Sequence, residues 1–473
     1  MIITPTKSFI KRLSLLYMIS LSLFCGAQNP IVTDGEMIES RIIYEKEGER
    51  YMPDPAREKM VKYTMKKASE FMRSISTKGG YAATYSEDLS KRYGEGFYEL
   101  ALPDEIFTQY PGTPAMGELF LRSYNVTKDE YYLARAYDAG KALVWGQRSE
   151  GGWDHLVDVS HYHSHLKTIE RKSGNCTYDD NITQGVLSFL IELDAYIDDP
   201  WLTESIDLAL AFILKSQADN GAWPQWYPSI GSYHDYWTFN DDAMNNTVRV
   251  LIKAHQVYGR KELLNSINKA GNFIIKAQVS NAQPGWAQQY DHDLKPGWGR
   301  RFEPPGVCSS VTASTIALLA DMYLYTKNES YLKPIPAAIE WLESSKLEEN
   351  LWARIYELKT NKPLYGQHDR RIHYLASEGR TDYNFQGSFG IRDKIGYCQQ
   401  VLASKKQPES QVLSDIDRRA KIDNMMKSVQ RAIAMLNTEG YWLDRETSMI
   451  NLEDFVDNMN LFCEHLELKA PDQ

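Results

Sequence analysis

The chain has 473 residues, of which 25% are charged and 12% are aromatic, and its formal net charge is −10 at pH 7. No basic stripe offsets this charge, which argues against a nucleic-acid partner. The 30 tyrosines and 11 tryptophans favour a carbohydrate ligand, because aromatic rings stack on sugar faces, although such rings serve equally well as core at helix ends.

The first 27 residues have the pattern of a secretory signal peptide. Three basic residues between positions 7 and 12 precede an apolar run at 13–24, and the small residues that follow predict cleavage after Ala27. The run is too short to anchor the protein in a membrane. We therefore expect a secreted or periplasmic protein that does not insert into the membrane. Lipid attachment at Cys25 is less favoured, because Phe24 before it is bulky.

Further along, a pattern of glutamine, glycine and tryptophan recurs. Gln147, Gly151 and Trp153 read Q-x-x-x-G-x-W, and residues 217–223 repeat the pattern. Weaker echoes stand at 79–81, 278–286, 351–352 and 440–442. A spacing of roughly 65 to 90 residues leaves room for two helices and a loop in each unit. Each mark alone also has a structural interpretation, since Gly ends helices and an aromatic ring packs under the turn.

Apolar residues between these marks recur at helical spacing. They lie on one face of each predicted helix, at 186–197, 206–214, 244–252, 267–277 and 316–323. No long alternating β pattern competes, and no composition break divides residues 28–473. We predict one all-α domain, an (α/α) toroid of helical hairpins whose loops form a substrate cleft at one end, and we expect a monomer. The cysteines after the leader match no zinc spacing.

Two acidic clusters stand directly before predicted helices. Residues 179–181 read Asp-Asp-Asn, and residues 240–242 read Asn-Asp-Asp. Either cluster alone is explained by helix capping. Because they belong to successive hairpins, however, they are expected at matching ends, where carboxylate and amide oxygens can share a Ca²⁺ ion. The predicted Ca²⁺ ligands are Asp179, Asp180, Asp241 and Asp242.

A loop rich in Gly and Pro concentrates cations in this acidic chain. Lys295, Arg300 and Arg301 lie within it, and Arg354 follows in the segment 352–365. Such a concentration suits an anionic ligand such as a uronate carboxylate, and a solvated basic loop is the alternative.

Together these segments resemble the pectate lyases of polysaccharide lyase family ten. The matching segments are 220–228, 238–244, 286–289, 300–305, 353–358 and 360–363, and the resemblance spans roughly residues 145–375. It implies a helical toroid that cleaves polygalacturonate by Ca²⁺-assisted anti β-elimination, leaving a double bond between C4 and C5 of the new end. It places the catalytic acids at Asp180 and Asp242, with their neighbours as alternatives, and the base at Arg300. Expected substrate contacts are Lys295, Arg301, Arg354, Trp223, Trp286 and Asn240.

The chemistry also sets physical requirements. Removal of the C5 proton leaves a carbanion beside the carboxylate, which a divalent cation stabilises directly. An arginine base is normally protonated, so it needs alkaline conditions or cationic surroundings. Lys295 and Arg301 are predicted to supply those surroundings, and the tandem Arg300-Arg301 leaves the register of the base open by one residue.

Other classes remain open at this stage. A non-catalytic oligouronide-binding protein keeps the basic and aromatic residues, and a glycoside hydrolase uses Asp180 and Asp242 as acid and base. A triterpene cyclase is less favoured, because it needs an apolar cavity. His161, His163 and His165, with His155 nearby, are interpreted as surface or substrate-contact histidines rather than a metal site.

Overall fold

The computed structural model describes residues 54–96, 99–163, 168–408 and 414–469. The predicted signal peptide and Cys25 lie outside these ranges. Within them, no helix combines the length and the apolar character that a membrane crossing requires.

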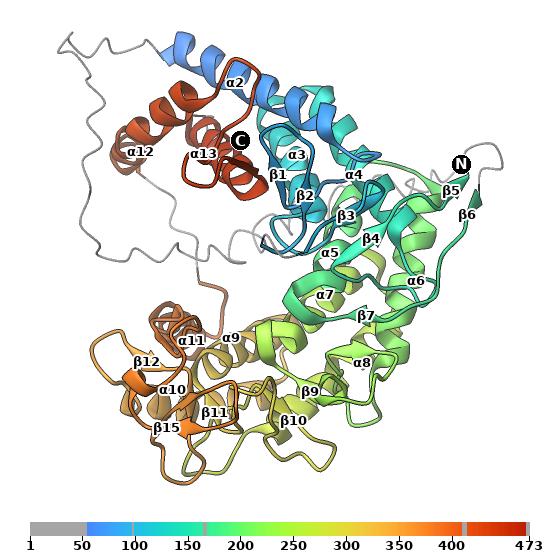
Figure 1. Cartoon of the computed structure of the whole chain (residues 1–473). Coiled ribbons are helices and arrows are strands. Elements are labelled where there is room, and N and C mark those ends of the chain that lie inside the picture. The colour runs from blue at the N-terminus through green and yellow to red at the C-terminus, as the bar shows by residue number, and fades with distance from the viewer. Residues whose placement is uncertain (1–53, 97–98, 164–167, 409–413, 470–473) are drawn as a thin grey trace, which may run out of the picture.

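Twelve helices of the described chain form two layers of a curved array. The inner layer consists of α3 (Thr113–Thr127), α5 (Ile182–Asp194), α7 (Ala243–Tyr258), α9 (Ser309–Thr326), α11 (Ile391–Ser404) and α13 (Leu452–Lys469). The outer layer consists of α2 (Asp54–Ile75), α4 (Glu130–Gly146), α6 (Pro200–Ser216), α8 (Lys261–Ala277), α10 (Ile335–Ser344) and α12 (Asp415–Met435). Successive inner helices contact one another from α13 through α3, α5, α7 and α9 to α11, along the arc in Figure 1. The predicted all-α toroid of helical hairpins is confirmed.

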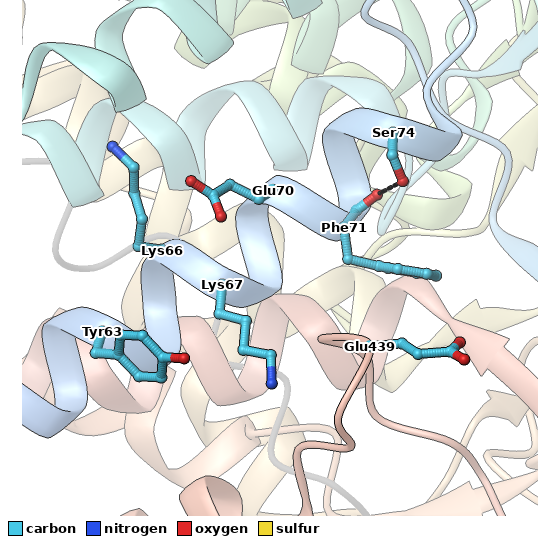
Figure 2. A pocket seen from close by; sticks show the side chains of 7 residues that line it. All are labelled: Tyr63, Lys66, Lys67, Glu70, Phe71, Ser74 and Glu439. Atoms are coloured by element: carbon cyan, nitrogen blue, oxygen red, sulfur yellow. Dashed lines mark hydrogen bonds between the residues drawn. The ribbon is translucent and has the colours of Figure 1, made fainter.

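Helix α2 packs against the last hairpin and so brings the two ends of the described chain together. The rings of Phe71 and Tyr441 lie with centroids 4.7 Å apart, and Lys67 Nζ donates to the Asn437 carbonyl at 3.3 Å. A hollow of about 570 Å³ lies on this face (Figure 2). It is lined by Tyr63, Lys66, Lys67, Glu70, Phe71, Ser74 and Glu439. No predicted site residue is among them.

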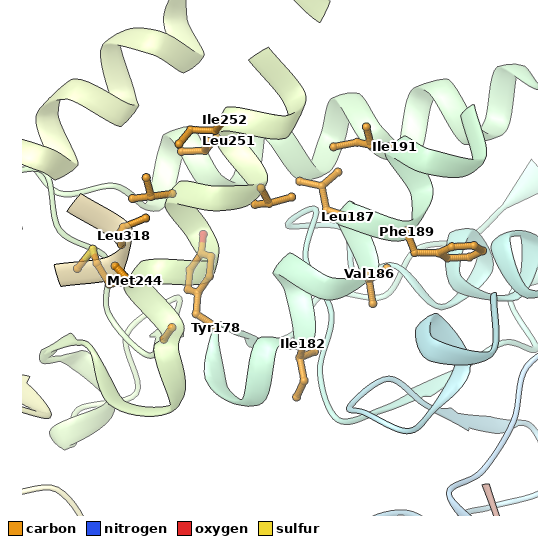
Figure 3. Packing of buried hydrophobic residues seen from close by; sticks show 14 of the residues in the cluster. Tyr178, Ile182, Val186, Leu187, Phe189, Ile191, Met244, Leu251, Ile252 and Leu318 are labelled. Atoms are coloured by element: carbon orange, nitrogen blue, oxygen red, sulfur yellow. The ribbon is translucent and has the colours of Figure 1, made fainter. Parts of the chain in front are cut away.

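The core runs between the two helical layers. Val186 and Phe189 of α5, Leu251 of α7 and Leu318 of α9 are fully buried in one cluster (Figure 3). Inner helix α9 is buried on nearly all sides, whereas outer helix α8 buries one stripe that includes Ile267, as its sequence pattern predicts. The four cysteines Cys176, Cys308, Cys398 and Cys463 are buried in this core as free thiols.

Short strands and turns occupy the loops between helices. The strands are β1 (Thr84–Ser86), β2 (Arg92–Tyr93), β3 (Glu105–Phe107), β4 (Leu156–Asp158), β5 (Tyr162–His163), β6 (Thr168–Ile169), β7 (Cys176–Thr177), β8 (Trp226–Tyr227), β9 (Trp237–Thr238), β10 (Gln289–Tyr290), β11 (Val307–Cys308), β12 (Trp352–Ala353), β13 (Ile355–Tyr356), β14 (Pro363–Gly366), β15 (Ile372–His373), β16 (Gln386–Gly387) and β17 (Met449–Asn451). The single 3₁₀ turns are η1 (Asp179–Asn181), η2 (Tyr233–Asp235), η3 (Asn240–Asp242), η4 (Glu329–Leu332) and η5 (Ala376–Glu378).

Three successive hairpins are tied in the same way. The strand before each inner helix pairs antiparallel with the strand after the outer helix of the same hairpin, as β7 with β8, β9 with β10 and β11 with β13. The residue two positions after each recurring tryptophan accepts a backbone hydrogen bond. The Tyr178 N–H donates to the Gln225 carbonyl at 2.8 Å, and the Phe239 N–H donates to the Gln288 carbonyl at 2.8 Å. The loops that enter α5 and α7 therefore occupy equivalent places.

The recurring tryptophans lock each outer helix to the loop that follows it. The indole N–H of Trp153 donates to the Leu143 carbonyl at 2.8 Å, and Trp223 and Trp286 make the same bond to the ends of α6 and α8. Trp223 is 1% exposed and Trp286 is 0% exposed. Their predicted role as substrate contacts is wrong, because neither ring can reach a sugar. The structural interpretation of these marks is the correct one.

Gly221 shows why a glycine stands in this pattern. Its φ of +98° is a conformation that other residues rarely adopt, and an added Cβ would lie 2.3 Å from the Lys269 carbonyl oxygen. We expect Gly221→Ala to lower the free energy of unfolding by roughly 2 kcal/mol or more. The matched control is Gly259→Ala, since Gly259 also has a positive φ of +64° but meets nothing within 4 Å. Equal losses in urea titrations of both variants would contradict the steric explanation.

Candidate active site

Turns η1 and η3 are two copies of one backbone conformation. Asp180 has φ 45° and ψ 30°, and Asp241 has φ 48° and ψ 34°. The next residues, Asn181 and Asp242, also have left-handed conformations, with φ of 60° and 56°. Left-handed backbone is uncommon for residues other than glycine, although Asp and Asn adopt it more readily than most, and residues held in it gather at functional sites. The repeat pairs Asp180 with Asp241, the alternative that the sequence left open, rather than with the preferred Asp242.

Asp242 faces a different part of the molecule. Its Oδ1 accepts a hydrogen bond from Asn245 Nδ2 at 3.0 Å. Its charge also acts on Lys394 of α11, where burial lowers the lysine pKa and Asp242 partly opposes that effect. Of the second acidic pair, Asp241 is therefore the residue that joins Asp179 and Asp180.

These three carboxylates crowd one another. Desolvation and the charge of Asp179 raise the pKa of Asp180 to about 6. Asp241 reaches solvent, but many protein atoms surround its carboxyl and desolvate it. This desolvation, with the charges of Asp179 and Asp180, raises its pKa to about 8. In this cluster the repulsion between carboxylates and their desolvation outweigh the attraction of nearby positive charges.

His155 belongs to the same group, although the sequence interpretation left it outside. One ligand atom from each of His155, Asp179 and Asp180 lies within 4.8 Å of the others. Burial opposes charge on its ring, but the hydrogen bond between Nδ1 and Asp154 Oδ1, at 3.2 Å, raises its pKa overall. A signal existed in the sequence, because His155 stands two residues after Trp153, as Gln225 does after Trp223.

The other predicted histidines are elsewhere. His161 is 8% exposed, and its Nε2 lies 3.5 Å from Asp158 Oδ2, so its predicted surface position is wrong. His163 belongs to β5, but the structure does not describe its side chain, and His165 lies outside the described residues.

Arg300 reaches the acidic cluster from the next hairpin. Its positive charge lowers the pKa of both Asp180 and Asp241, so one guanidinium acts electrostatically on carboxylates from two loops. Two hydrogen bonds hold it to Glu303: Nε donates at 3.0 Å and Nη2 at 2.6 Å. The Glu303 carboxylate is 3% exposed, whereas the Arg300 side chain is 48% exposed. This fork uses the edge formed by Nε and Nη2, so Nη1 and the remaining Nη2 proton can still donate to a ligand.

Glu303, and not the predicted Lys295 and Arg301, has the largest effect of any neighbour on the charge of Arg300. Burial alone would lower its pKa, but the hydrogen bonds and charge of Glu303 outweigh this, and the pKa is raised well above its usual value. Tyr383 and Asp241 act in the same direction. Lys295 is exposed, and its Nζ lies 3.4 Å from Asp293 Oδ2. Asp293 is its one ion-pair partner among the described residues. Arg300 is therefore held as a cation.

The remaining predicted contacts divide into two groups. Arg301 is exposed beside Arg300, and Arg354 lies 5.0 Å from the Tyr383 ring centroid with its Nε donating to the Asn384 carbonyl at 2.8 Å. Arg354 is placed to meet an anionic ligand near Arg300, because both guanidinium groups lie against the Tyr383 ring. No contact of the described chain places the Arg301 side chain at this site, so its predicted role stays a prediction. Asn240 is different, because it is 9% exposed and its Nδ2 donates to Asp241. It positions Asp241 and is too buried for the predicted substrate contact.

The donor set fits a hard divalent cation. Asp179 Oδ1 is buried without a hydrogen-bond partner among the described residues, as is Oε1 of Gln288, whose Nε2 holds Asn240 Oδ1 at 2.7 Å. Buried oxygens without donors are rare unless an ion or water satisfies them. Carboxylate oxygens from Asp179, Asp180 and Asp241 are the type of ligand that Ca²⁺ prefers, whereas the imidazole of His155 is not.

The raised carboxyl pKa values give a stability prediction for metal-free protein. The folded state binds the Asp180 and Asp241 protons more tightly than the unfolded chain, whose Asp pKa is about 3.9. Their contribution is present below that pH and is lost as the pH rises through about 6 and about 8. We expect chelated protein to lose stability across this range, and Ca²⁺ to stabilise it most above pH 8. Melting curves with and without chelator measure this, and an equal effect of Ca²⁺ at all pH values would contradict it.

Comparison with known families bears on this site. A family model described as pectic acid lyase matches residues 147–351. This part of the chain is therefore similar to the pectic acid lyase family. The pectic acid lyase region contains η1, η3 and Arg300, and it ends just before Arg354. The predicted resemblance is thus confirmed over a shorter stretch than residues 145–375, and with it the enzyme class of polysaccharide lyase. A comparison with curated proteins gave no match.

Solved structures similar to this chain include polysaccharide lyases and mannanases. A family 10 polysaccharide lyase from Cellvibrio cellulosa is 22% identical, covers 59% of this chain and 95% of its own, and gives a TM-score of 0.49. A mutant of a family 10 lyase from the same organism, in complex with trigalacturonic acid, is 22% identical and gives a TM-score of 0.48. It covers 61% of this chain and 98% of its own. An alpha-1,6-mannanase from Salegentibacter is 13% identical, covers 86% of this chain and 100% of its own, and gives 0.42.

Proposed function

We propose that this polysaccharide lyase cleaves polygalacturonate by Ca²⁺-assisted anti β-elimination. The observation that carries the proposal is the convergence of Asp180, Asp241 and Arg300, which come from successive hairpins of the pectic acid lyase region. Arg300 is close enough to lower the pKa of both carboxyls. An acidic pole that suits a cation, beside an open guanidinium, is the arrangement that a uronate bound through its carboxylate requires.

In the proposed reaction the C5 proton leaves to a base, the electron pair of the C5–H bond forms the C4=C5 double bond, and the C4–O4 bond breaks. The departing O4 takes up a proton. Asp179, Asp180 and Asp241 would hold the Ca²⁺ ion, which would supply positive charge next to the substrate carboxylate. Arg300 donates hydrogen bonds to the same sugar and stabilises the negative charge that develops at C5 and C6. Glu303 and Asn240 position Arg300 and Asp241.

The ion pair with Glu303 bears on the form in which Arg300 acts. To act as a base, Arg300 would first have to lose a guanidinium proton, and the ion pair with Glu303 opposes that loss. We therefore expect Arg300 to act as a cation, and Glu303→Gln to lower kcat about tenfold or more at every pH, because the fork that orients the guanidinium is weakened. A pH–rate profile of this variant checks the assignment. Faster turnover near neutral pH would instead support the base role.

The cellular setting is also part of the proposal. A leader cleaved after Ala27 would deliver the protein to the periplasm or the medium, where plant polysaccharide is met, and a monomer suffices for the site. Mass spectrometry of the mature N-terminus and light scattering test these two statements.

The function is tested with purified protein, polygalacturonate and Ca²⁺. We expect ultraviolet absorbance from the unsaturated uronate and oligomers lighter by one water than hydrolysis products. Saturated oligomers would favour a glycoside hydrolase, and binding without products would favour an oligouronide-binding protein. Either outcome overturns the proposal.

A further inference from the structure

A second hollow adjoins the acidic cluster on the side of the β2–β3 loop. Its volume is about 610 Å³, and its lining includes Leu100, Leu102, Glu99, Glu105, His155 and Trp226. His155 belongs both to this lining and to the group with Asp179 and Asp180. The hollow therefore borders the candidate active site at His155. Its first four lining residues precede the pectic acid lyase region.

The hollow has an apolar wall that faces water. Leu100 is 57% exposed and Leu102 is 58% exposed, an unusual position for two leucines so close in the chain. Trp226 is half-buried in the same lining, with its ring centroid 6.2 Å from His155 and 5.7 Å from His234. An aromatic ring beside exposed apolar side chains is a surface on which the C–H face of a sugar packs.

The charge of the hollow is negative. Glu99, Glu105 and Asp154 contribute carboxylates, and no Lys or Arg is among its described lining residues. Glu105 Oε2 accepts from the Leu102 N–H at 2.8 Å, and Asp154 lies 3.7 Å from Arg148 Nη2, outside the hollow. Glu95, on the same loop, adds charge that reaches Asp180. A uronate carboxylate placed here would be repelled, whereas sugar hydroxyls can donate to these oxygens.

We propose that this hollow is a subsite for an uncharged glycosyl unit of the polymer, next to the uronate held at the acidic cluster. The unit is either a methyl-esterified galacturonate or a neutral sugar. This inference rests on the proposed function, since it deepens the substrate class of the same site. It assigns the two ends of the cleft opposite preferences: the Arg300 end takes a carboxylate, and the β2–β3 end takes a unit without one.

The first test is a charge reversal that leaves the Arg300 cluster intact. Product formation is measured on polygalacturonate and on partially methyl-esterified polygalacturonate, with wild type and Glu99→Lys. We expect wild type to prefer the esterified polymer, and Glu99→Lys to shift the ratio of kcat/KM several-fold toward the unesterified one. The matched control is Glu329→Lys, an exposed glutamate in η4 at the opposite end of α9. An unchanged ratio, or a wild-type preference for the unesterified polymer, overturns the inference.

The second test does not need catalysis, so it separates the inference from the proposed function. Calorimetry measures binding of a fully methyl-esterified oligogalacturonate and of a neutral galacto-oligosaccharide to wild type and to Leu100→Asp. Binding of at least one of them, weakened several-fold by Leu100→Asp, supports the subsite and identifies the source of the unit. Binding of neither, or no effect of Leu100→Asp, overturns the subsite even where the lyase assay succeeds. If the lyase assay fails, this binding result still decides the inference.

Discussion

Arg300→Ala is expected to lower kcat/KM on polygalacturonate at least about 100-fold, the usual cost of losing one positioned donor for a developing negative charge. The positive charge of the guanidinium lowers the pKa of both Asp180 and Asp241. Glu303 binds one edge of the guanidinium, so its remaining N–H groups are available to the substrate. Initial rates of unsaturated-product formation measure the loss. Arg300→Lys should recover only part of the rate, because an ammonium keeps the charge but lacks the planar fork.

Two controls make this result specific. Arg301→Ala removes an exposed neighbour of the same type and should change kcat/KM less than about threefold, as expected for a contact in high dielectric. Circular dichroism of Arg300→Ala must match wild type, since the buried Glu303 retains its hydrogen bond from Tyr383 at 2.9 Å. An active Arg300→Ala with an inactive Arg301→Ala or Arg354→Ala would move the catalytic role to that residue.

Asp180→Asn and Asp241→Asn form the second prediction with a large effect. Each replaces a carboxylate of the acidic cluster with a neutral side chain of the same shape. We expect each to raise the Ca²⁺ concentration needed for half-maximal activity at least about tenfold, because Ca²⁺ affinity follows the number of charged oxygen ligands. Titration of activity with Ca²⁺ after exhaustive chelation measures this. Wild type should be inactive in excess chelator and recover fully when Ca²⁺ is restored.

Asp242→Asn is the matched control for this pair, since it is the adjacent acid of η3. The Asp242 carboxylate accepts a hydrogen bond from Asn245, so the substitution should change the Ca²⁺ dependence only slightly. The opposite order, with Asp242→Asn severe and Asp241→Asn mild, would restore the assignment made from sequence. Activity that resists chelation in every variant would remove Ca²⁺ from the mechanism.

Much of the fold follows from local rules that a sequence displays. The apolar spacing at 267–277 predicts α8 and the stripe it buries, and the glycines of the repeat predict the positive φ at Gly151 and Gly221. The repeat also implies that residues two positions after each tryptophan share one loop position. His155, Gln225, Gln288 and Arg354 occupy it, and this regularity would have identified His155.

The active-site register could not be predicted in the same way. Asp180 and Asp241 become equivalent because both lie in left-handed turns, a conformation that Asp adopts only occasionally. The sequence pattern alone therefore could not align Asp180-Asn181 with Asp241-Asp242. The pairing of Arg300 with Glu303 depends on a loop whose course is set by long-range contacts, such as the bond from Tyr383. Burial of Trp223 and Asn240 is likewise a tertiary property, because both residue types are common at sugar-binding surfaces as well as in cores.

A crystal structure of Arg300→Lys with Ca²⁺ and trigalacturonate tests the central claim most directly. We predict one ion at about 2.3–2.6 Å from oxygens of Asp180 and Asp241 and from a uronate carboxylate, with the substituted side chain facing that same sugar. An ion bound away from these two carboxylates, or an oligosaccharide that leaves position 300 untouched, would contradict it.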